Sequence, residues 1–141
     1  ASETGADTLI GGAGDDMLYG EAGNDILVIG NGLDEAWGGS GVDQFVFDVA
    51  DGAVDILHDF SAAEGDVLNI TDILEGFDAG DSILDFVQLV DSGDDTELHI
   101  NADGDVGGAF TAIAVFDGGV SDTLSDLINN GNLVAEFFGF F

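Results

Sequence analysis

Apolar residues recur with a period of nine in the first third of the chain, where residues 2–46 divide into five consecutive nonapeptides. These are Ser2–Ile10, Gly11–Tyr19, Gly20–Val28, Ile29–Trp37 and Gly38–Val46. The eighth position is always apolar, and its residues are Leu9, Leu18, Leu27, Ala36 and Phe45. The last three residues of each repeat are therefore predicted to form a short strand whose middle side chain points inward. A flexible linker rich in Gly and Asp, the alternative, needs no apolar residue in a fixed phase.

Two polar positions of the repeat are as regular as the apolar one. The fourth residue is always glycine, at Gly5, Gly14, Gly23, Gly32 and Gly41, and the sixth is always aspartate, at Asp7, Asp16, Asp25, Asp34 and Asp43. Glycine permits the positive φ of a tight loop and leaves backbone carbonyls uncovered. Aspartate adds a hard anionic oxygen at the end of the loop. Ligation by oxygen alone selects Ca²⁺, so the repeats predict calcium sites.

The second repeat, Gly11–Tyr19, matches the pattern Gly-Gly-x-Gly-x-Asp-x-U-x throughout, where U is a large apolar residue. In this it resembles the RTX (repeat-in-toxin) family of secreted calcium-binding proteins. The resemblance implies a parallel β-roll in which two nonapeptides make one coil and each ion lies between loops one coil apart. It also implies that the first loop supplies its second and fourth carbonyls and its Asp. The next loop supplies its first and third carbonyls and its Asp.

Carried over to this sequence, the resemblance implies three calcium sites. The first takes Glu3, Gly5, Asp7, Gly20, Ala22 and Asp25; the second takes Gly12, Gly14, Asp16, Ile29, Asn31 and Asp34; the third takes Glu21, Gly23, Asp25, Gly38, Ser40 and Asp43. Asp55 and Asp66 are candidates to complete half-sites left by Asp34 and Asp43, which would allow up to five ions, and Asp59 is a weaker candidate. Further candidate ligands are Gly30, Gly32, Gly39 and Gly41. The first and fourth repeats depart most from the pattern, since the first lacks both opening glycines and the fourth opens with Ile29.

Composition strengthens the expectation of bound cations. The chain has 30 Asp and Glu residues but no Lys or Arg, for a formal charge of −30, although 45% of its residues are hydrophobic. Self-repulsion of that charge in a compact state is on the order of 30 kcal/mol, above the roughly 5–15 kcal/mol of a typical folding free energy. Folding therefore needs cations from solution.

The same composition excludes several classes of function. Without a basic residue the chain has nothing to neutralise the phosphates of a nucleic acid or to adhere to anionic lipid. Without cysteine it has no disulfide, thiolate zinc site or cysteine nucleophile. No apolar run is long enough for a transmembrane helix, and the N-terminal segment does not resemble a standard signal peptide. A start at Ala1 suggests a fragment of a longer protein.

Beyond the repeats, an all-β fold is predicted to continue with less regular elements. We expect residues 1–70 to form the roll with irregular extra coils, and residues 71–141 to form a capping and secretion-target region packed on it. Coils are predicted around Asp55–Leu57 and Asp66–Leu68. A small antiparallel meander and one short helix should follow, with strands at Asp85–Val90, Glu97–Asn101 and Phe110–Phe116, turns at Asp91–Thr96 and Asn101–Gly108, and the helix at Ser121–Asn130. Asn101–Asp105 begins like an EF-hand loop, but Ala112 stands where the bidentate Glu belongs, so a β-turn is favoured.

The stretch from Phe45 to Phe141 resembles the C-terminal target domain of type I secretion substrates, in the version that closes very large RTX adhesins. This resemblance implies export by an ABC transporter, without a cleaved signal, to the outside or the cell surface of a Gram-negative bacterium. Extracellular calcium would then fold the module, which we expect to be a monomer. The alternative is the C-terminal tail of a secreted hydrolase, a protease or lipase, whose catalytic domain lies elsewhere.

The chain itself is not expected to be an enzyme, because it contains no HExxH, no GxSxG and no cysteine. His58 and His99 are the only histidines, and each is better explained as a surface or packed residue than as a general base. An ice-binding or glycan-binding face is not expected either, since the third positions form no array of Thr or Asn. The ninth positions predict Ile10, Val28 and Val46 on one outer face, and Tyr19 and Trp37 on the other. We expect the C-terminal part to cover one of these faces, and a partner site is the alternative.

Overall fold

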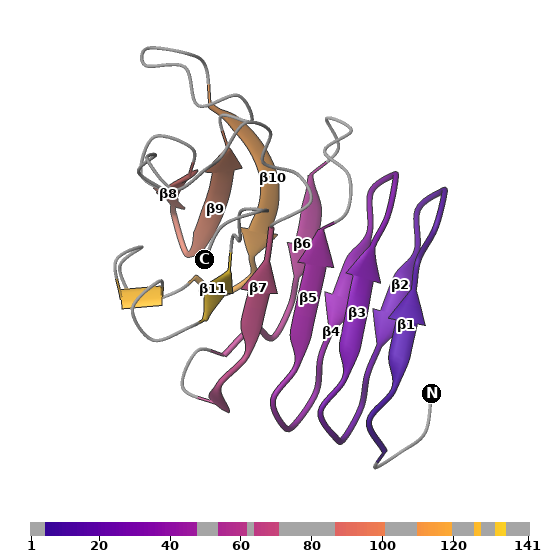
Figure 1. Cartoon of the computed structure of the whole chain (residues 1–141). Helices are drawn as coiled ribbons and strands as arrows, with labels where there is room; N and C mark the ends of the chain where they lie inside the picture. Colours follow the sequence, from indigo (N-terminus) through magenta and orange to yellow (C-terminus); the bar gives the residue numbers. More distant parts are fainter. Residues whose placement is uncertain are drawn as a thin grey trace, which may run out of the picture.

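The computed structural model describes residues 5–47, 54–61, 64–70, 87–100, 110–119, 126–127 and 132–134, and its strands form two sheets (Figure 1). One sheet has the order β1-β3-β5-β7-β11, and the other has the order β2-β4-β6-β10-β9-β8. The strands are β1 Thr8–Ile10, β2 Met17–Tyr19, β3 Ile26–Ile29, β4 Glu35–Trp37, β5 Gln44–Phe47, β6 Asp55–Leu57, β7 Val67–Asn69, β8 Val87–Ser92, β9 Asp95–Ile100, β10 Thr111–Phe116 and β11 Leu133–Val134.

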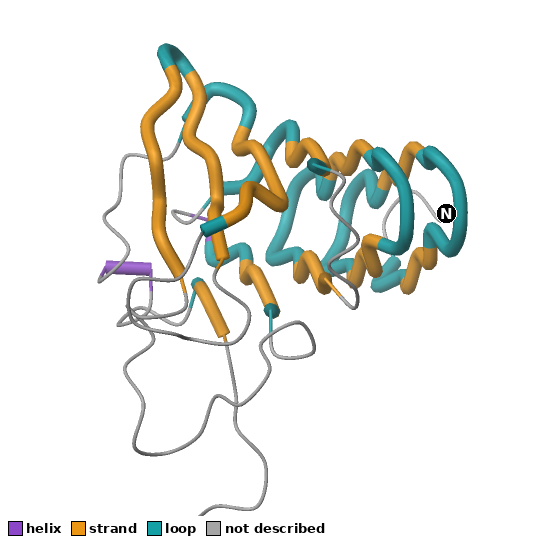
Figure 2. Tube along the Cα trace, turned by 90° about the horizontal axis from the view of Figure 1, so that it is seen from above, coloured by secondary structure: helices purple, strands orange, loops and turns teal. Residues whose placement is uncertain are grey.

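Successive strands of the repeat segment alternate between the two sheets, so the chain winds as a flattened coil (Figure 2). Neighbouring strands within a sheet are parallel, and Thr8 pairs with Ile26 as Met17 pairs with Glu35. Two nonapeptides therefore make one coil, with an offset of 18 residues between stacked positions. The offset grows to 21 at β6 and to 23 at β7, because longer connections replace the regular loops. The predicted parallel β-roll and its irregular extra coils are confirmed.

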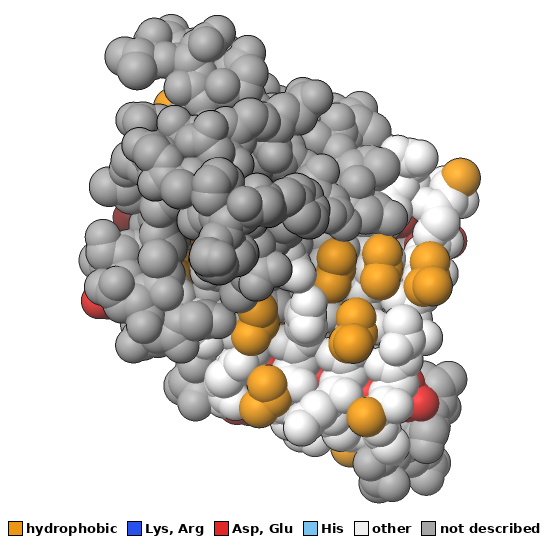
Figure 3. Space-filling view, in the orientation of Figure 1, with side chains coloured by type: hydrophobic (Ala, Val, Ile, Leu, Met, Phe, Trp, Pro, Cys, Tyr) orange, Lys and Arg blue, Asp and Glu red, His pale blue; other side chains and the backbone are white. Residues whose placement is uncertain are grey.

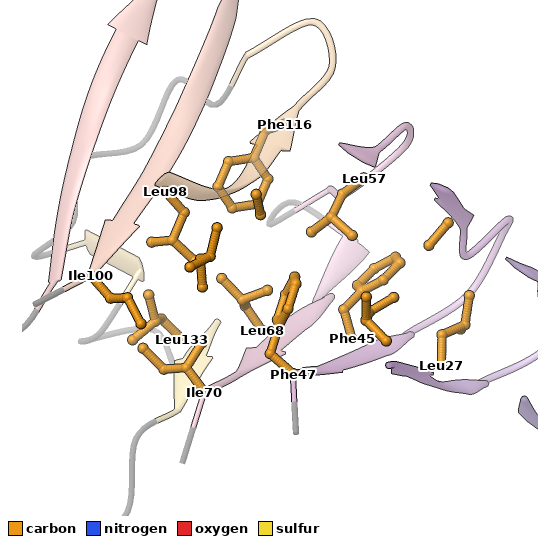
Figure 4. Close-up of a cluster of buried hydrophobic side chains, with 14 of the residues drawn as sticks. Leu27, Phe45, Phe47, Leu57, Leu68, Ile70, Leu98, Ile100, Phe116 and Leu133 are labelled. Atoms are coloured by element: carbon orange, nitrogen blue, oxygen red, sulfur yellow. The ribbon is translucent and has the colours of Figure 1, made fainter. Parts of the chain in front are cut away.

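The space between the two sheets is filled by the eighth-position residues (Figure 4). Leu27, Ala36 and Phe45 are completely buried, and Leu57 and Leu68 take the same place in the irregular coils. Each large apolar side chain buried in this way stabilises the fold by roughly 1.5–3 kcal/mol. Ala36 buries less apolar surface than the other residues of this row, because its side chain is a single methyl group. The repeat phase thus places one apolar row between the sheets, and Ile29, Phe47 and Ile70 belong to the same core.

The C-terminal strands extend the sheets of the roll. β8, β9 and β10 form an antiparallel meander, and β10 then pairs in parallel with β6 while β11 pairs in parallel with β7. Leu98 and Ile100 of β9 are buried while His99 is only half-buried, as their alternation predicts. Through these pairings the core of the roll continues under the meander.

The predicted turn at Asp91–Thr96 is too long. In the structure β8 extends to Ser92 and β9 begins at Asp95, and only Gly93 and Asp94 form the turn. Gly93 has a φ of 70°, which allows a hairpin with two connecting residues. The predicted turn at Asn101–Gly108, the EF-hand-like start and the C-terminal Phe residues lie outside the described residues. So does most of the predicted helix, of which the two described members, Asp126 and Leu127, have helical backbone.

The outer face formed by β1, β3 and β5 carries rows of apolar side chains (Figure 3). Ile10 pairs with Val28 and Val28 pairs with Val46, which places these ninth-position residues in one row across the sheet. Ile10 is 70% exposed. The other sheet carries Tyr19 and Trp37 in register on its own outer face. Within the described ranges, the chain has no helix of the length and apolarity needed to cross a bilayer.

Candidate metal centre

The loops at both edges of the roll follow the glycine pattern. The fourth-position glycines have φ angles of 100° to 126°, at Gly14, Gly23, Gly32 and Gly41. This left-handed backbone is why a side chain is disfavoured there. Glu21, at the second position of the third repeat, adopts a φ of 75° although it has a side chain, so this loop carries local strain.

The repeat aspartates form a ladder of carboxylates along each edge. On one edge Asp7 N donates to Asp25 Oδ1 at 2.8 Å, and Asp25 N donates to Asp43 Oδ1 at 2.9 Å. On the other edge Asp16 N donates to Asp34 Oδ1 at 2.8 Å. Asp25, Asp34 and Asp43 therefore each hold the loop one coil earlier with Oδ1, which keeps Oδ2 in a fixed direction.

The Oδ2 atoms of Asp16, Asp25 and Asp43 are buried, and within the described part of the chain they lack a hydrogen-bond partner. An ionised oxygen left unpartnered in a buried place is costly, and it demands a cation or a proton. Burial raises the pKa of Asp43 from 3.8 to about 6, against the lowering effect of the Asp25 N–H, and nearby carboxylates add to the rise. The chain has no Lys or Arg to supply the missing positive charge.

Backbone carbonyls converge on the same spaces. A Cβ atom placed on Gly20 would lie 2.5 Å from Gly38 O and 2.7 Å from Asp25 Oδ2, so both oxygens border a space that is open only because residue 20 has no side chain. The carbonyls of Glu21 and Gly23 face the following loop, because a Cβ on Gly39 or Gly41 would collide with them. Carbonyl and carboxylate oxygens are the donors that Ca²⁺ prefers. The residues present therefore fit calcium.

The six residues of the predicted third set lie on two neighbouring loops that are hydrogen-bonded to each other: Glu21, Gly23 and Asp25 on one, and Gly38, Ser40 and Asp43 on the next. Gly23 N donates to Ser40 O, and Ser40 N donates to Glu21 O, both at 3.0 Å. In the second set, Asn31 N donates to Gly12 O at 2.8 Å, and a Cβ on Gly30 or Gly32 would collide with Gly12 or Gly14 of the preceding loop.

In the first set, Asp25 contacts both Asp7, whose N–H it accepts, and the space beside Gly20. Ala22 forms a β-bridge with Ser40 of the next coil. Glu3 lies outside the described residues. Within the described ranges, no group of three or more acidic or histidine side chains is arranged to hold a metal ion by itself. An ion at these loops would therefore depend on backbone carbonyls.

The candidates beyond the repeats differ from the repeat aspartates. Asp66 Oδ1 accepts from Asp43 N at 2.9 Å, as the ladder requires, but its Oδ2 also accepts from Ser61 N at 2.8 Å. Burial raises the pKa of Asp66. Asp55 Oδ1 accepts from Asp34 N at 2.9 Å and continues the second ladder.

Asp59 contacts the fifth loop through both oxygens, which accept from Gly38 N and Gly39 N at 2.8 Å. The repeat pattern contains no signal for this contact, because Asp59 lies outside the nonapeptides.

Three rings are stacked on the outer face of the second sheet, those of Tyr19, Trp37 and His58. The rings of Tyr19 and Trp37 are 4.5 Å apart, and those of Trp37 and His58 are 4.1 Å apart, all nearly parallel. His58 also bridges Glu35 at 2.8 Å and Asp117 at 2.9 Å, one carboxylate on each ring nitrogen. Burial lowers the pKa of His58, but the two carboxylates outweigh it and raise the pKa above 6.5. When it is protonated, His58 links Glu35 of β4 to Asp117, the residue after β10, through two ion pairs.

Stacked glycine loops with inward carboxylates and carbonyls, on a parallel coil of short strands, define a calcium-binding β-roll. Residues 2–36 match the family model of the RTX calcium-binding nonapeptide repeat, in four copies. The repeat segment is thus an RTX β-roll, as its resemblance predicts, and its repeats are of the calcium-binding kind. No curated protein sequence matches the chain.

Two of the solved structures that match the chain are subunits of one enzyme. The solution structure of the AlgE6R3 subunit from the Azotobacter vinelandii mannuronan C5-epimerase is 24% identical, with a TM-score of 0.53, and the match covers 95% of this chain and 80% of that one. The AlgE6R2 subunit of the same epimerase is 22% identical over 90% of this chain and 91% of that one, with a TM-score of 0.44. The first of these likenesses concerns the fold alone.

Proposed function

We propose that this chain is the calcium-binding C-terminal module of a type I-secreted RTX protein, a large surface adhesin, and that extracellular Ca²⁺ folds it. The observation that carries this proposal is the set of buried, unpartnered carboxylate oxygens at Asp16, Asp25 and Asp43, in a chain with no Lys or Arg. RTX repeats are typical of secreted bacterial proteins.

The mechanism follows from charge. Inside a cell, where free calcium is scarce, a formal charge of −30 keeps the chain extended and suited to passage through an ABC transporter. Outside, calcium at millimolar concentration fills sites whose affinity in extracellular modules is about 10⁻⁴–10⁻³ M. Each ion offsets two charges and joins two coils, so binding and folding are one event. Folding on the outer side opposes backsliding.

In this proposal the three predicted ligand sets of the repeats hold three calcium ions, and Asp55 and Asp66 allow up to five. The proposed module has no catalytic residues, binds no nucleic acid and does not insert into a membrane. Far-UV circular dichroism with and without EDTA tests the calcium-folding step. The proposal expects residues 2–70 to lose most of their strand signal in EDTA and to regain it when Ca²⁺ is restored. An unchanged spectrum in EDTA would falsify it.

The second candidate is the tail of a secreted enzyme. A similar fold in a subunit of an epimerase favours it. The reading frame upstream of Ala1 separates the two candidates, because an adhesin has long repeated domains there and an enzyme has a catalytic domain.

A further inference from the structure

One carboxylate outside the repeats holds the start of the fifth glycine loop. Asp59 Oδ1 accepts from Gly38 N, and Asp59 Oδ2 accepts from Gly39 N, both at 2.8 Å. In the third repeat the N–H of Gly20, which is equivalent to that of Gly38, donates instead to Trp37 O of the next coil at 2.8 Å. Asp59 Oδ1 therefore lies where a backbone carbonyl of a further regular coil would accept the N–H of Gly38.

The geometry of the peptide group turns this contact into a constraint on a carbonyl. In a planar trans peptide the C=O and the N–H point in opposite directions. Gly39 N–H and Gly38 C=O belong to the same peptide, so a Gly39 N–H held by Asp59 directs Gly38 O to the opposite side. On that side lie Gly20 and the unpartnered Oδ2 of Asp25.

The preceding peptide behaves in the same way. Gly38 N–H is held by Asp59, and Trp37 C=O points to the opposite side, where it accepts from Gly20 N at 2.8 Å. The peptide between Trp37 and Gly38 is thus held on both sides. The peptide between Gly38 and Gly39 lies between two glycines, which rotate easily, and Gly39 has a φ of 91°. An external anchor is needed to keep the Gly38 carbonyl in place.

We propose that Asp59 is a positioning residue that fixes the Gly38 carbonyl toward the calcium site of Asp25 and Asp43. This rests on the proposed function, that the loops hold calcium. Asp59 holds the peptide that carries the ligand oxygen. Carboxylates that orient a metal ligand in this way occur at other metal centres, where their loss costs about 10–100-fold in metal affinity. Both of its oxygens receive an N–H of the fifth loop, so in this proposal Asp59 orients the backbone of that loop and the Gly38 carbonyl contacts the ion.

The test is a calcium titration of the full chain by isothermal calorimetry, with Asp59→Asn as the variant. Asparagine keeps one acceptor oxygen and cannot hold both N–H groups. The matched control is Asp15→Asn, which removes the same charge. Asp15 Oδ1 accepts from Leu33 N at 2.9 Å, and Asn24 makes the equivalent contact to Val42 N at the same distance, so an amide suffices there.

We expect Asp59→Asn to bind as many ions as the wild type, with one site weakened by about 10–100-fold. Asp15→Asn should titrate like the wild type. The ¹³C resonance of the Gly38 carbonyl reports the site directly. In Asp59→Asn it should reach the wild-type end point, but only at correspondingly higher calcium, whereas a purely structural role of Asp59 would leave that midpoint unchanged.

Three results would overturn the proposal. One is equal affinity in Asp59→Asn and Asp15→Asn. A second is the loss of a whole ion from Asp59→Asn, which would make Asp59 a ligand. A third is an Asp59→Asn chain that stays unfolded at saturating calcium, because a merely weakened site refills there. Failure of the proposed function is a separate result, since the wild type itself would then bind no calcium.

Discussion

Substitution of Gly20 by alanine tests whether the space between stacked loops is a calcium site. The new methyl group would lie 2.5 Å from Gly38 O and 2.7 Å from Asp25 Oδ2, closer than carbon and oxygen can approach. Neither neighbour gives way easily, because one is backbone and the other belongs to a fully buried side chain. The methyl therefore displaces the two oxygens that we propose bind the ion. Gly11→Ala, at the same repeat position, is the milder comparison, since its closest contact is at 3.3 Å to Asp16 Oδ2 and this proposed ligand oxygen has to move only slightly.

The expected loss has two parts. Overpacking costs about 1–3 kcal/mol of the free energy of unfolding. Loss of one ion with a dissociation constant of about 10⁻⁴–10⁻³ M costs about 1.4–2.7 kcal/mol more at about 10 mM calcium. Together these are about 2–6 kcal/mol, a large share of a typical folding free energy of about 5–15 kcal/mol. For Gly11→Ala we expect less than about 1 kcal/mol, because only the end of a side chain must move.

The assay is far-UV circular dichroism during a calcium titration, followed by calorimetric counting of bound ions. Gly20→Ala should fold only at higher calcium than the wild type and bind at least one ion fewer. Gly11→Ala should shift the midpoint by less than Gly20→Ala and bind as many ions as the wild type. If the two variants share one midpoint and one ion count, the space beside Gly20 is not a calcium site and the reasoning is wrong.

Four further predictions follow from the same contacts. Asp25→Ala should raise the calcium midpoint more than Asp7→Ala, because Asp25 borders two of the proposed sites; equal midpoints in the CD titration would contradict this. The pKa of Asp43, raised to about 6, means that its ionisation destabilises the calcium-free fold as the pH rises from about 4 through 6. At low pH calcium must displace a proton from Asp43. The calcium concentration at the folding midpoint should therefore decrease as the pH is raised from about 5 to about 7.5, and a midpoint independent of pH would contradict this. His58 has its pKa raised, so its ion pairs stabilise the fold at low pH and are lost as the pH rises through that pKa. His58→Gln should therefore lower the Tm more at about pH 6 than at about pH 9 in saturating calcium, because at the higher pH only the stack on Trp37 remains to be lost; an equal loss at both would refute the ion-pair role. Glu21→Gly should raise the free energy of unfolding by about 1 kcal/mol, measured by urea unfolding in calcium, because it relieves a positive φ; any loss of stability would argue against strain at that residue.

The repeat segment is predictable from the sequence because every coil uses the same local rule. An apolar residue in fixed phase determines which side chains face inward, and Leu27 and Phe45 are buried as that phase predicts. Glycine and aspartate in fixed phase likewise predict the loops and the direction of the carboxylates. Stacking then follows, because identical coils can pair in only one register without moving the apolar row out of the core. The turn after β8 was mispredicted because its polar residues continue the strands across a two-residue hairpin.

The contacts between the repeats and the rest of the chain could not be predicted from the periodicity of the sequence. His58 reaches Asp117, 59 residues away, and Asp59 reaches Gly38 across an irregular coil. Their spacing follows no period, so a linear pattern carries no signal for them.

The amino-acid order by itself determined the β-roll, its inward row and its need for cations, since these depend on local periodicity and on total charge. Only the tertiary structure decided which carboxylate oxygens are left unpartnered and which are already filled by N–H groups, as at Asp59 and Asp66. That distinction depends on directions in space between distant peptides, and the sequence alone does not encode such directions in any local pattern.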